Sequence, residues 1–427
     1  MRKGRYIFDL LEYPMSLKGY SPLFPQIFRI KFFFVFFSSK KNSSDISSKN
    51  KEREKREMTT TAASSSATTA LERAIARTLE AFIRRSQGGG SGGASSSSNG
   101  QSKSGVYGGG HGVFLGKSRS VLRLTGKDGK KLLQGLLTND VDLLLDDDDN
   151  NEQMYAAMLT PKGRIVTDVF LTKGRSDNGG RRNNDEILID SCQLAKETLL
   201  TQIVRRKLRS DVCVEDASEE LSVRVMPPSF DTDDTDCGGR GNVLLPSDPR
   251  WFGLGRRGIV FDATKKTDKD AELDEKVYAN WRHANGVPEG SLELGERFPA
   301  ESRLTHLHAV SFTKGCYVGQ EPTARAEFQG EVRKGVVPVV FYESKEVKIN
   351  GIVISKKDGK EIGKVVASRG GGVGLALVRF AKVENVSEGI SIETVDESDG
   401  GEKEEKAFTE CEFGTPNWWS HHWNSRD

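Results

Sequence analysis

The feature that most restricts how this chain can fold is the stretch at residues 311–321, which reads Ser-Phe-Thr-Lys-Gly-Cys-Tyr-Val-Gly-Gln-Glu. Gly315 and Gly319 flank the thiol of Cys316, and glycine tolerates positive φ and lets the backbone approach a ligand closely. Pro322 follows, and proline suits the first turn of a helix because its missing N–H needs no partner there. The stretch predicts a tight loop that carries Cys316 to a surface and then enters a short helix. The alternative is a buried cysteine in an ordinary turn, since free cysteine often behaves as a small hydrophobe.

The same residues carry a resemblance to a known family. Residues 314–321, Lys-Gly-Cys-Tyr-Val-Gly-Gln-Glu, closely resemble the signature of the YgfZ-type folate-binding proteins. These proteins are relatives of the glycine-cleavage aminomethyltransferase and assist iron–sulfur cluster assembly. Residues 134–140 and the turn and strand at residues 160–170 resemble further landmarks of that family. The resemblance covers the region from about residue 115 to about residue 420.

The resemblance implies an α+β fold in two parts. An aminomethyltransferase-like folate-binding body occupies residues 113–333, and a small C-terminal antiparallel β-barrel with its tail occupies residues 334–427. The residues themselves also predict the barrel, because short alternating strands separated by turn residues recur across residues 336–378. The adjacent Trp418 and Trp419 are interpreted as a cap on the barrel core.

The resemblance also implies tetrahydrofolate as a cofactor in a central cavity. The side chains that we assign to this cavity are Arg164, Asp168, Glu301, Lys314 and Gln320. For two of them an alternative stays open. Arg164 binds the pterin or a folate carboxylate, or it forms a surface salt bridge. Lys314 reaches the folate glutamate tail, or its ammonium lowers the pKa of the neighbouring thiol.

One position argues against aminomethyl transfer. In the aminomethyltransferases the strand after the turn carries two adjacent aspartates, and the first supports chemistry on the folate methylene. The matching pair here is Thr167-Asp168. Threonine cannot take a proton as a carboxylate does, nor stabilise an adjacent cation by charge. We therefore expect no turnover enzyme, and a folate-dependent aminomethyl or other one-carbon transferase is the alternative.

The family points to a function in iron–sulfur cluster assembly. The resemblance implies support for the maturation of [4Fe–4S] proteins in the mitochondrial matrix, with A-type iron–sulfur scaffold proteins and [4Fe–4S] client enzymes as partners. Cys316 is the predicted functional thiol and a possible transient ligand of a cluster. A folate-binding interaction module without chemistry of its own is a third hypothesis. The formal net charge of +2 gives no indication of a nucleic-acid partner.

The cysteines and histidines predict no fixed metal site. Five widely spaced cysteines without a C-x-x-C motif argue against a disulfide framework and a closed zinc site, and they suit a reducing compartment. His306 and His308 would share a face if they lie on a strand, with Cys316 nearby. A three-ligand metal site is one hypothesis for this trio. Structural or solvent-facing histidines are the other, because no fourth ligand has a defined spacing.

The N-terminal region differs in composition from the rest. Its longest uninterrupted apolar run, residues 32–37, is far too short to span a bilayer, so no membrane segment is expected. We hypothesise that residues 1–57 are an extension from an over-long gene model and that translation starts at Met58. Residues 58–112 then combine an amphipathic, Arg-rich and Ser-rich mitochondrial targeting segment with a flexible Gly/Ser linker. The alternative for the first part is a short solvent-exposed helix on a linker.

Overall fold

A computed structural model of the chain describes part of it, and the statements below concern that part. The described residues are 70–88, 112–145, 152–175, 182–228, 245–261, 268–330, 332–342, 347–383, 390–394, 407–416 and 418–419. The hypothetical extension at residues 1–57, the start of the targeting segment at residues 58–69 and the linker at residues 89–111 lie outside them. Within the described ranges, no helix is long and apolar enough to cross a membrane.

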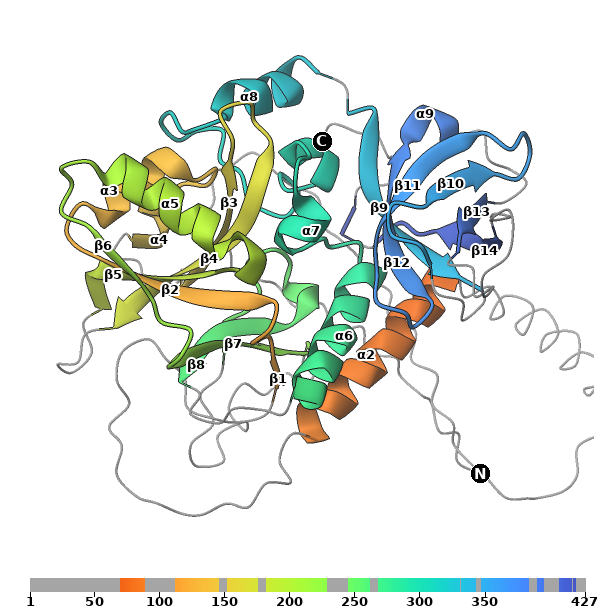
Figure 1. Ribbon diagram of the computed structural model, residues 1–427, viewed down its shortest axis with the longest axis horizontal. Helices are drawn as coiled ribbons and strands as arrows, with labels where there is room; N and C mark the ends of the chain where they lie inside the picture. The colour runs from red at the N-terminus through yellow and green to blue at the C-terminus, as the bar shows by residue number, and fades with distance from the viewer. Residues whose placement is uncertain are drawn as a thin grey trace, which may run out of the picture. The chain divides into compact units, whose positions relative to one another are not determined.

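The body contains a five-stranded antiparallel sheet with helices on one face (Figure 1). In spatial order its strands are β3 (Gln153–Leu159), β4 (Ile165–Arg175), β5 (Arg182–Cys192), β2 (Arg119–Thr125) and β6 (Cys213–Asp216). The helices are α3 (Gly129–Leu136), α4 (Val141–Leu145) and α5 (Lys196–Lys207). Leu133 and Leu136 of α3 and Leu199 and Ile203 of α5 recur at helical spacing and are buried together against the sheet. The helical spacing of apolar residues across 132–137 and across 199–208 in the sequence predicts these two longer helices.

Strands β3 and β4 form a hairpin, which the sequence predicts from two apolar runs joined by a Pro- and Gly-containing turn at residues 160–163. Its connection is closed by hydrogen bonds from the Thr160 amide to the Arg164 carbonyl (2.8 Å) and from the Gly163 amide to the Thr160 carbonyl (2.9 Å). Gly163 has a φ of 72°, a conformation that side chains with a Cβ rarely adopt. A Cβ there would also lie 2.9 Å from Pro322, so the hairpin turn packs directly against the start of a later helix.

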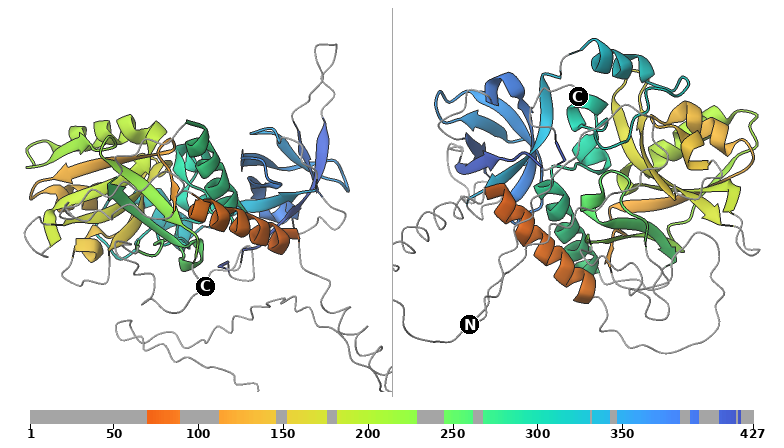
Figure 2. Two further views of the ribbon diagram at one scale, coloured as in Figure 1. Left: turned by 90° about the horizontal axis from the view of Figure 1, so that it is seen from below. Right: turned by 180° about the vertical axis from the view of Figure 1, so that it is seen from behind.

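A smaller sheet carries two long helices that lie side by side in Figures 1 and 2. Its strands are, in spatial order, β1 (Val113–Phe114), β7 (Leu221–Met226) and β8 (Arg256–Phe261). The helices are α2 (Ala70–Gly88) and α6 (Asp268–Ala284). Phe82 of α2 is fully buried between Tyr278 and Trp281 of α6, with ring centroids 5.8 and 6.4 Å away.

The helix of the predicted targeting segment packs against the body in the structure. The helix forms as the periodicity predicts, but its apolar face is packed rather than free, with Leu71, Ala74 and Phe82 buried. The Arg85 guanidinium pairs with the Asp274 carboxylate, and the Gly112 amide donates to the Ser86 carbonyl (3.1 Å). Residues 70–88 are therefore a structural element of the body. Composition alone did not reveal this, because an import helix and a packed amphipathic helix share one pattern.

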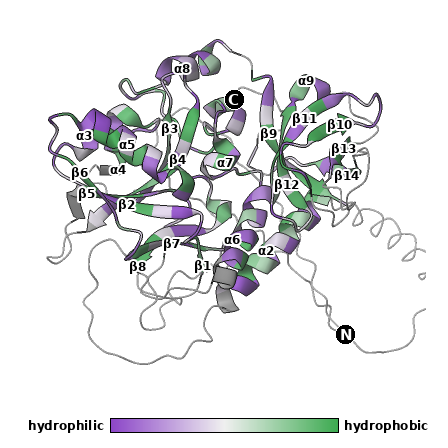
Figure 3. Cartoon of the chain, in the orientation of Figure 1, coloured by the Kyte–Doolittle hydropathy of each residue, from purple (hydrophilic) through white to green (hydrophobic). Residues whose placement is uncertain are grey.

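The predicted barrel is confirmed as a closed antiparallel barrel of six strands. In order around the barrel these are β10 (Ile352–Ser355), β11 (Glu361–Ser368), β12 (Val373–Arg379), β9 (Lys334–Phe341), β14 (Phe408–Phe413) and β13 (Ile390–Glu393). Figure 3 shows hydrophobic residues along β12, and these residues are mostly buried. Trp419 belongs to the barrel core and Trp418 packs against it, as predicted. The Trp418 indole also donates to the Asn285 carbonyl (2.8 Å) of the body.

Short elements connect the sheets and the barrel. They are η1 (Gln193–Ala195), η2 (Phe252–Leu254), α7 (Gly290–Leu294), η3 (Pro299–Ser302), α8 (Gln320–Phe328) and α9 (Phe380–Val383). The predicted tight loop lies between η3 and α8, and α8 is the short helix predicted to follow it. Pro322 stands in its first turn, where its missing N–H leaves no partner unsatisfied.

Candidate functional site

The site is built around the cysteine loop, residues 311–319. Its anchor is Lys314, which is only 8% exposed. The Lys314 ammonium donates to three backbone carbonyls at the end of α3, those of Gln134 (2.8 Å), Leu137 (2.9 Å) and Asn139 (2.6 Å). A lysine ammonium has three hydrogens, and a helix C-terminus leaves carbonyls without partners, so each group satisfies the other.

Two backbone contacts complete the attachment of the loop to this turn. The Val318 amide donates to the Gly135 carbonyl (3.1 Å), and the Ser311 amide donates to the Thr138 carbonyl (3.0 Å). On the other side Gly319 has a φ of 82°, and a Cβ there would lie 2.6 Å from the Thr160 carbonyl oxygen. The three landmarks of the family resemblance, residues 134–140, 160–170 and 314–321, therefore meet at one place in the fold.

The loop presents its thiol to solvent. Cys316 is exposed and reduced, and a Cβ at the preceding Gly315 would meet no heavy atom within 4 Å. Within the loop, the Phe312 ring meets the ring of Phe328 of α8 edge to face, with centroids 5.5 Å apart. Phe328 is 66% exposed. The exposed-loop prediction is confirmed, and the buried-cysteine alternative is wrong for Cys316.

Burial changes the electrostatics of the anchor. Removal from water lowers the pKa of Lys314 to about 8, and the carboxylates of Asp140 and Asp142 act in the opposite direction. The ammonium also lies 5.2 Å from the centroid of the Tyr317 ring. All three of its hydrogens are donated to carbonyls, so none is left for a folate glutamate tail.

The remaining residues assigned to a folate cavity have partners within the protein. Arg164 stacks its guanidinium 3.9 Å from the centroid of the Phe298 ring and donates to the Glu296 carbonyl (2.9 Å). Glu301 accepts from the Phe298 amide (3.0 Å) at the start of η3 and pairs with Lys334 of the barrel (3.1 Å). The surface salt bridge that was one alternative for Arg164 is replaced by contacts with an aromatic ring and a carbonyl.

Gln320 and Asp168 lie in different surroundings from each other. Gln320 begins α8 and lines a hollow of about 440 Å³ beside Arg325 and Phe328. Asp168 is fully buried on β4 and accepts from Arg119 (3.0 Å) and from the Gly290 amide (3.1 Å). Of the assigned residues, only Lys314 and Gln320 lie at the cysteine loop.

Thr167 occupies the position of the missing aspartate and faces away from Asp168. Side chains alternate along a strand, so Thr167 lies on the face of Val169 and Leu171, which belong to the core under α3 and α5. Its hydroxyl donates to the Asp168 carbonyl (3.1 Å). No carboxylate is available at this position for proton transfer.

Asp168 belongs to a buried group of charges that sequence reasoning missed. We call it the arginine cluster, and its members are Arg119, Arg250, Arg257, Arg282, Asp168, Asp190, Asp248, Glu289, Glu293 and Tyr278. These side chains are all buried. Glu289 stands at the centre, 2.7 Å from Arg250 and 3.2 Å from Arg257. Burial alone raises the pKa of Glu289, but the guanidiniums of Arg257, Arg282 and Arg250 outweigh it and hold the pKa well below its usual range.

The geometry does not supply one cavity for folate in the described part of the chain. Lys314, Glu301, Asp168 and Arg164 are each bound to protein groups, and a hollow of about 890 Å³ between α3 and the end of α5 is lined by none of them. The five assigned residues therefore do not fit a common folate site.

The histidines do not form the hypothetical metal trio. Residues 303–308 form turns rather than a strand, so the argument from alternation does not apply to His306 and His308. His306 lies 3.1 Å from the Thr305 hydroxyl, and burial lowers the pKa of His308. Among the residues described, no group of three or more His, Cys, Asp or Glu side chains could hold a metal ion.

Two comparisons define the class of protein. The model of the CAF17 C-terminal β-barrel domain matches residues 333–421. The fold is similar to the crystal structure of glycine cleavage system aminomethyltransferase T from Bartonella henselae, with a TM-score of 0.52, 13% identity and coverage of 82% of this chain and 91% of that one. At this identity the likeness shows the fold alone. The chain has the predicted aminomethyltransferase-like α+β fold with a CAF17-type barrel.

Sequence relatives narrow the class to a family. The human iron-sulfur cluster assembly factor IBA57, mitochondrial, is 31% identical over 285 residues, which cover 62% of this chain and 77% of the relative. A homologue from Mycosarcoma maydis is 35% identical over 240 residues, 52% of this chain, and the match spans only 56% of that relative. The chain belongs to the IBA57 family of mitochondrial iron–sulfur cluster assembly factors. The family predicted from residues 314–321 and its mitochondrial compartment are thereby confirmed.

Proposed function

We propose that this protein supports the maturation of [4Fe–4S] proteins in the mitochondrial matrix, and that Cys316 is its functional thiol. The observation that carries the proposal is an exposed cysteine on a loop whose backbone is fixed at both ends by the fold. A thiolate is the soft ligand that iron–sulfur clusters require. In this proposal the cluster is cargo, and Cys316 contacts it while a partner holds the other ligands.

The surroundings of Cys316 suit contact with a second protein. Gly315 adds no side chain, so another surface can come close to the thiol. The exposed Phe328, its partner Phe312 and the hollow along α8 provide an aromatic surface next to it, and aromatic residues are enriched at protein interfaces. We propose A-type iron–sulfur scaffold proteins and [4Fe–4S] client enzymes as the partners at this surface.

The substitution Cys316→Ser tests the proposal. Serine is close in size to cysteine, but it is a poor soft-metal ligand and a weak nucleophile at neutral pH. Because Cys316 is exposed, we expect an unchanged melting temperature together with complete loss of complementation in cells that lack the protein. Activities of [4Fe–4S] and [2Fe–2S] enzymes, measured side by side, report the function.

Other cysteines provide matched controls. Cys213 is exposed on β6, and Cys192 and Cys411 are buried. Cys213→Ser should complement fully at normal stability, and a buried variant should lose stability before function. Full complementation by Cys316→Ser at normal protein level contradicts the thiol mechanism.

Folate binding is a separate proposal that the fold motivates and the side-chain geometry does not support. Calorimetry of the full chain with tetrahydrofolate tests it, and absence of heat at high folate concentration removes it. A folate-dependent one-carbon transferase has still less support, because Thr167 faces the core and Asp168 is bound by Arg119. Only folate-dependent turnover of a protein-bound aminomethyl group would support the transferase hypothesis.

We also propose that residues 58–86 direct import into mitochondria. A fluorescent passenger carrying this segment should reach the matrix, and a cytosolic or plastid signal contradicts the proposal. The targeting role and the packed role of α2 are compatible, because import takes place before the chain has folded. Mass spectrometry of the N-terminus of the mature protein shows how much of the segment is kept.

A further inference from the structure

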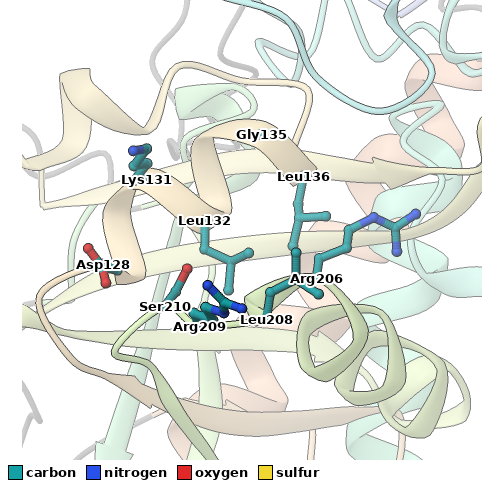
Figure 4. Close-up of a pocket in the computed structure, with 9 residues that line it drawn as sticks. All are labelled: Asp128, Lys131, Leu132, Gly135, Leu136, Arg206, Leu208, Arg209 and Ser210. Atoms are coloured by element: carbon teal, nitrogen blue, oxygen red, sulfur yellow. The ribbon is translucent and has the colours of Figure 1, made fainter.

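A hollow lies between α3 and the C-terminal end of α5, on the helix-covered face of the five-stranded sheet. Its volume is about 890 Å³, within the usual range of roughly 300–1,000 Å³ for small-molecule sites. Figure 4 shows Leu132 and Leu136 extending from α3 toward Leu208, with Arg206 and Arg209 beside them. None of these residues belongs to the cysteine loop.

The lining combines an apolar floor with cationic groups. Leu132, Leu136 and Leu208 supply the floor, and Lys131, Arg206 and Arg209 supply the cations. Within the described part of the chain, these three cations form no ion pair, although Arg206 donates to the Gln202 side chain. Asp128 is the acidic residue of the lining, and its carboxylate already accepts the Asp211 amide (2.8 Å).

Gly135 is a glycine that the protein's own packing does not require. It lies inside α3, where glycine destabilises a helix relative to alanine. A Cβ at this position would meet no heavy atom within 4 Å, so no neighbouring protein group excludes a side chain. Gly135 lines the hollow, and its missing side chain leaves room for a ligand to approach the backbone.

Leu208 is the second unusual feature of the hollow. It follows α5 with a φ of 44°, a region that residues other than glycine rarely adopt, and it is 85% exposed. An exposed leucine gains no burial energy from this conformation. Strained backbone of this kind is concentrated at functional sites, where the surrounding fold maintains it.

From these features we infer that the hollow binds an amphiphilic anion, a molecule with an apolar body and a phosphate or carboxylate group. The apolar body packs on Leu132, Leu136 and Leu208 above Gly135. Figure 4 shows the guanidiniums of Arg209 and Arg206 at opposite ends of this floor, so the anionic group pairs with one of them, and either guanidinium matches the geometry of phosphate and carboxylate oxygens. A soluble acyl-type anion and the headgroup region of an anionic lipid share this chemistry.

Gly135 connects the hollow to the cysteine loop. Gly135 lines the hollow, and its carbonyl accepts the Val318 amide of the loop (3.1 Å). The neighbouring Gln134 carbonyl accepts the Lys314 ammonium (2.8 Å). A ligand above Gly135 is therefore placed to change the exposure of Cys316. The binding site is independent of the proposed function, whereas the importance of this coupling rests on it.

Calorimetry of the full chain with octyl phosphate tests the binding site. We expect saturable binding of one equivalent, and at least tenfold weaker binding of octanol and of inorganic phosphate, which each lack half of the ligand. Sedimentation with phosphatidylcholine vesicles, with and without phosphatidylglycerol, distinguishes the sources. Binding to anionic vesicles identifies a lipid headgroup, and octyl phosphate binding without it identifies a soluble amphiphile.

Three variants locate the binding. Gly135→Leu fills the hollow without a clash at its Cβ and should abolish octyl phosphate binding. Arg206→Gln combined with Arg209→Gln should weaken it at least tenfold. Arg205→Gln is the matched control, because Arg205 is exposed on the same helix and does not line the hollow. Circular dichroism and melting temperature establish that each variant is folded.

Maleimide labelling at Cys316, read by peptide mass spectrometry, tests the coupling. Octyl phosphate should change the labelling rate at least twofold in the unmodified chain and leave it unchanged in Gly135→Leu. No binding of octyl phosphate, or equal binding by folded Gly135→Leu, overturns the inference. If either result overturns this inference, the proposed function still stands as long as Cys316→Ser fails to complement.

Discussion

The cysteine loop and the arginine cluster both include residues from the landmark segments of the family. They differ in what surrounds their functional side chains. In the loop, the hydrogen bonds hold the backbone and leave the Cys316 thiol exposed. In the cluster, the hydrogen bonds join the charged groups to one another, and Glu289 and its guanidinium partners are buried. A fixed backbone with a free functional group suits reaction with a partner, whereas mutually satisfied buried charges suit structure. The comparison predicts that substitution of Cys316 reduces function at normal stability, whereas substitutions in the arginine cluster reduce stability.

The substitution with the largest expected effect is Glu289→Gln in the arginine cluster. The amide keeps the shape of the side chain but removes the negative charge among Arg250, Arg257 and Arg282. Breaking a buried ion pair costs about 3–5 kcal/mol, because the partner charges stay buried without compensation. Urea denaturation measures the loss. Glu321→Gln, at an exposed pair with Arg325, should change the free energy of unfolding by less than about 1 kcal/mol.

A smaller loss in the free energy of unfolding for Glu289→Gln would contradict a structural role for the arginine cluster. If its free energy of unfolding matches that of Glu321→Gln while complementation is lost, the cluster acts in function rather than in structure. If stability falls and the remaining folded protein still complements, the cluster is structural as proposed.

Phe82→Ala tests whether α2 forms a wall of the cluster. Phe82 packs against Tyr278, whose hydroxyl accepts from Arg250 (2.8 Å). Removing a buried phenyl ring costs about 3 kcal/mol or more. Thermal and urea denaturation should show this loss, and Arg84→Ala, at an exposed position of the same helix, should show almost none. If the two variants are equally stable, α2 does not stabilise the folded body, and only its proposed targeting role is left.

Lys314→Met should give an intermediate loss of stability, because Lys314 anchors the loop whereas Cys316 of the same loop is exposed. The substitution leaves three carbonyls at the end of α3 without their donor, which costs roughly 1–3 kcal/mol. Because the loop loses its anchor, we expect reduced complementation as well as reduced stability. The control Lys127→Met, at an exposed residue just before the same helix that does not line the hollow, should affect neither. Reduced function at full stability would instead assign Lys314 a direct chemical role.

The smallest expected effect is a pH dependence of the same anchor. Burial lowers the pKa of Lys314 from 10.5 to about 8. Between these values the unfolded chain holds a proton that the folded chain has released, so unfolding takes up a proton and the free energy of unfolding rises with pH. The difference in this free energy between the natural chain and Lys314→Met should therefore grow from pH 8 to pH 10. A constant difference would show that the ammonium keeps its ordinary pKa.

The sequence predicted the elements whose signal is local. Gly315 and Gly319, a following proline and the family motif located the cysteine loop and α8, and the spacing of leucines located α3 and α5. Short alternating strands predicted the barrel. Each of these patterns depends on neighbours within about ten residues, so tertiary contacts did not need to be known.

Only the tertiary structure decided which groups face one another. Arg119, Arg257 and Arg282 lie on β2, β8 and α6, and Glu289 follows a separate turn, so no sequence spacing links them. A charged residue in a sequence is usually a surface residue, and its burial depends on a partner that another segment supplies. For the same reason the sequence identified Lys314 and Cys316 as a pair, but the structure assigned the ammonium to the carbonyls of α3 and the thiol to solvent. Periodicity shows which residues share a face, and the packing of the whole chain determines what that face contacts.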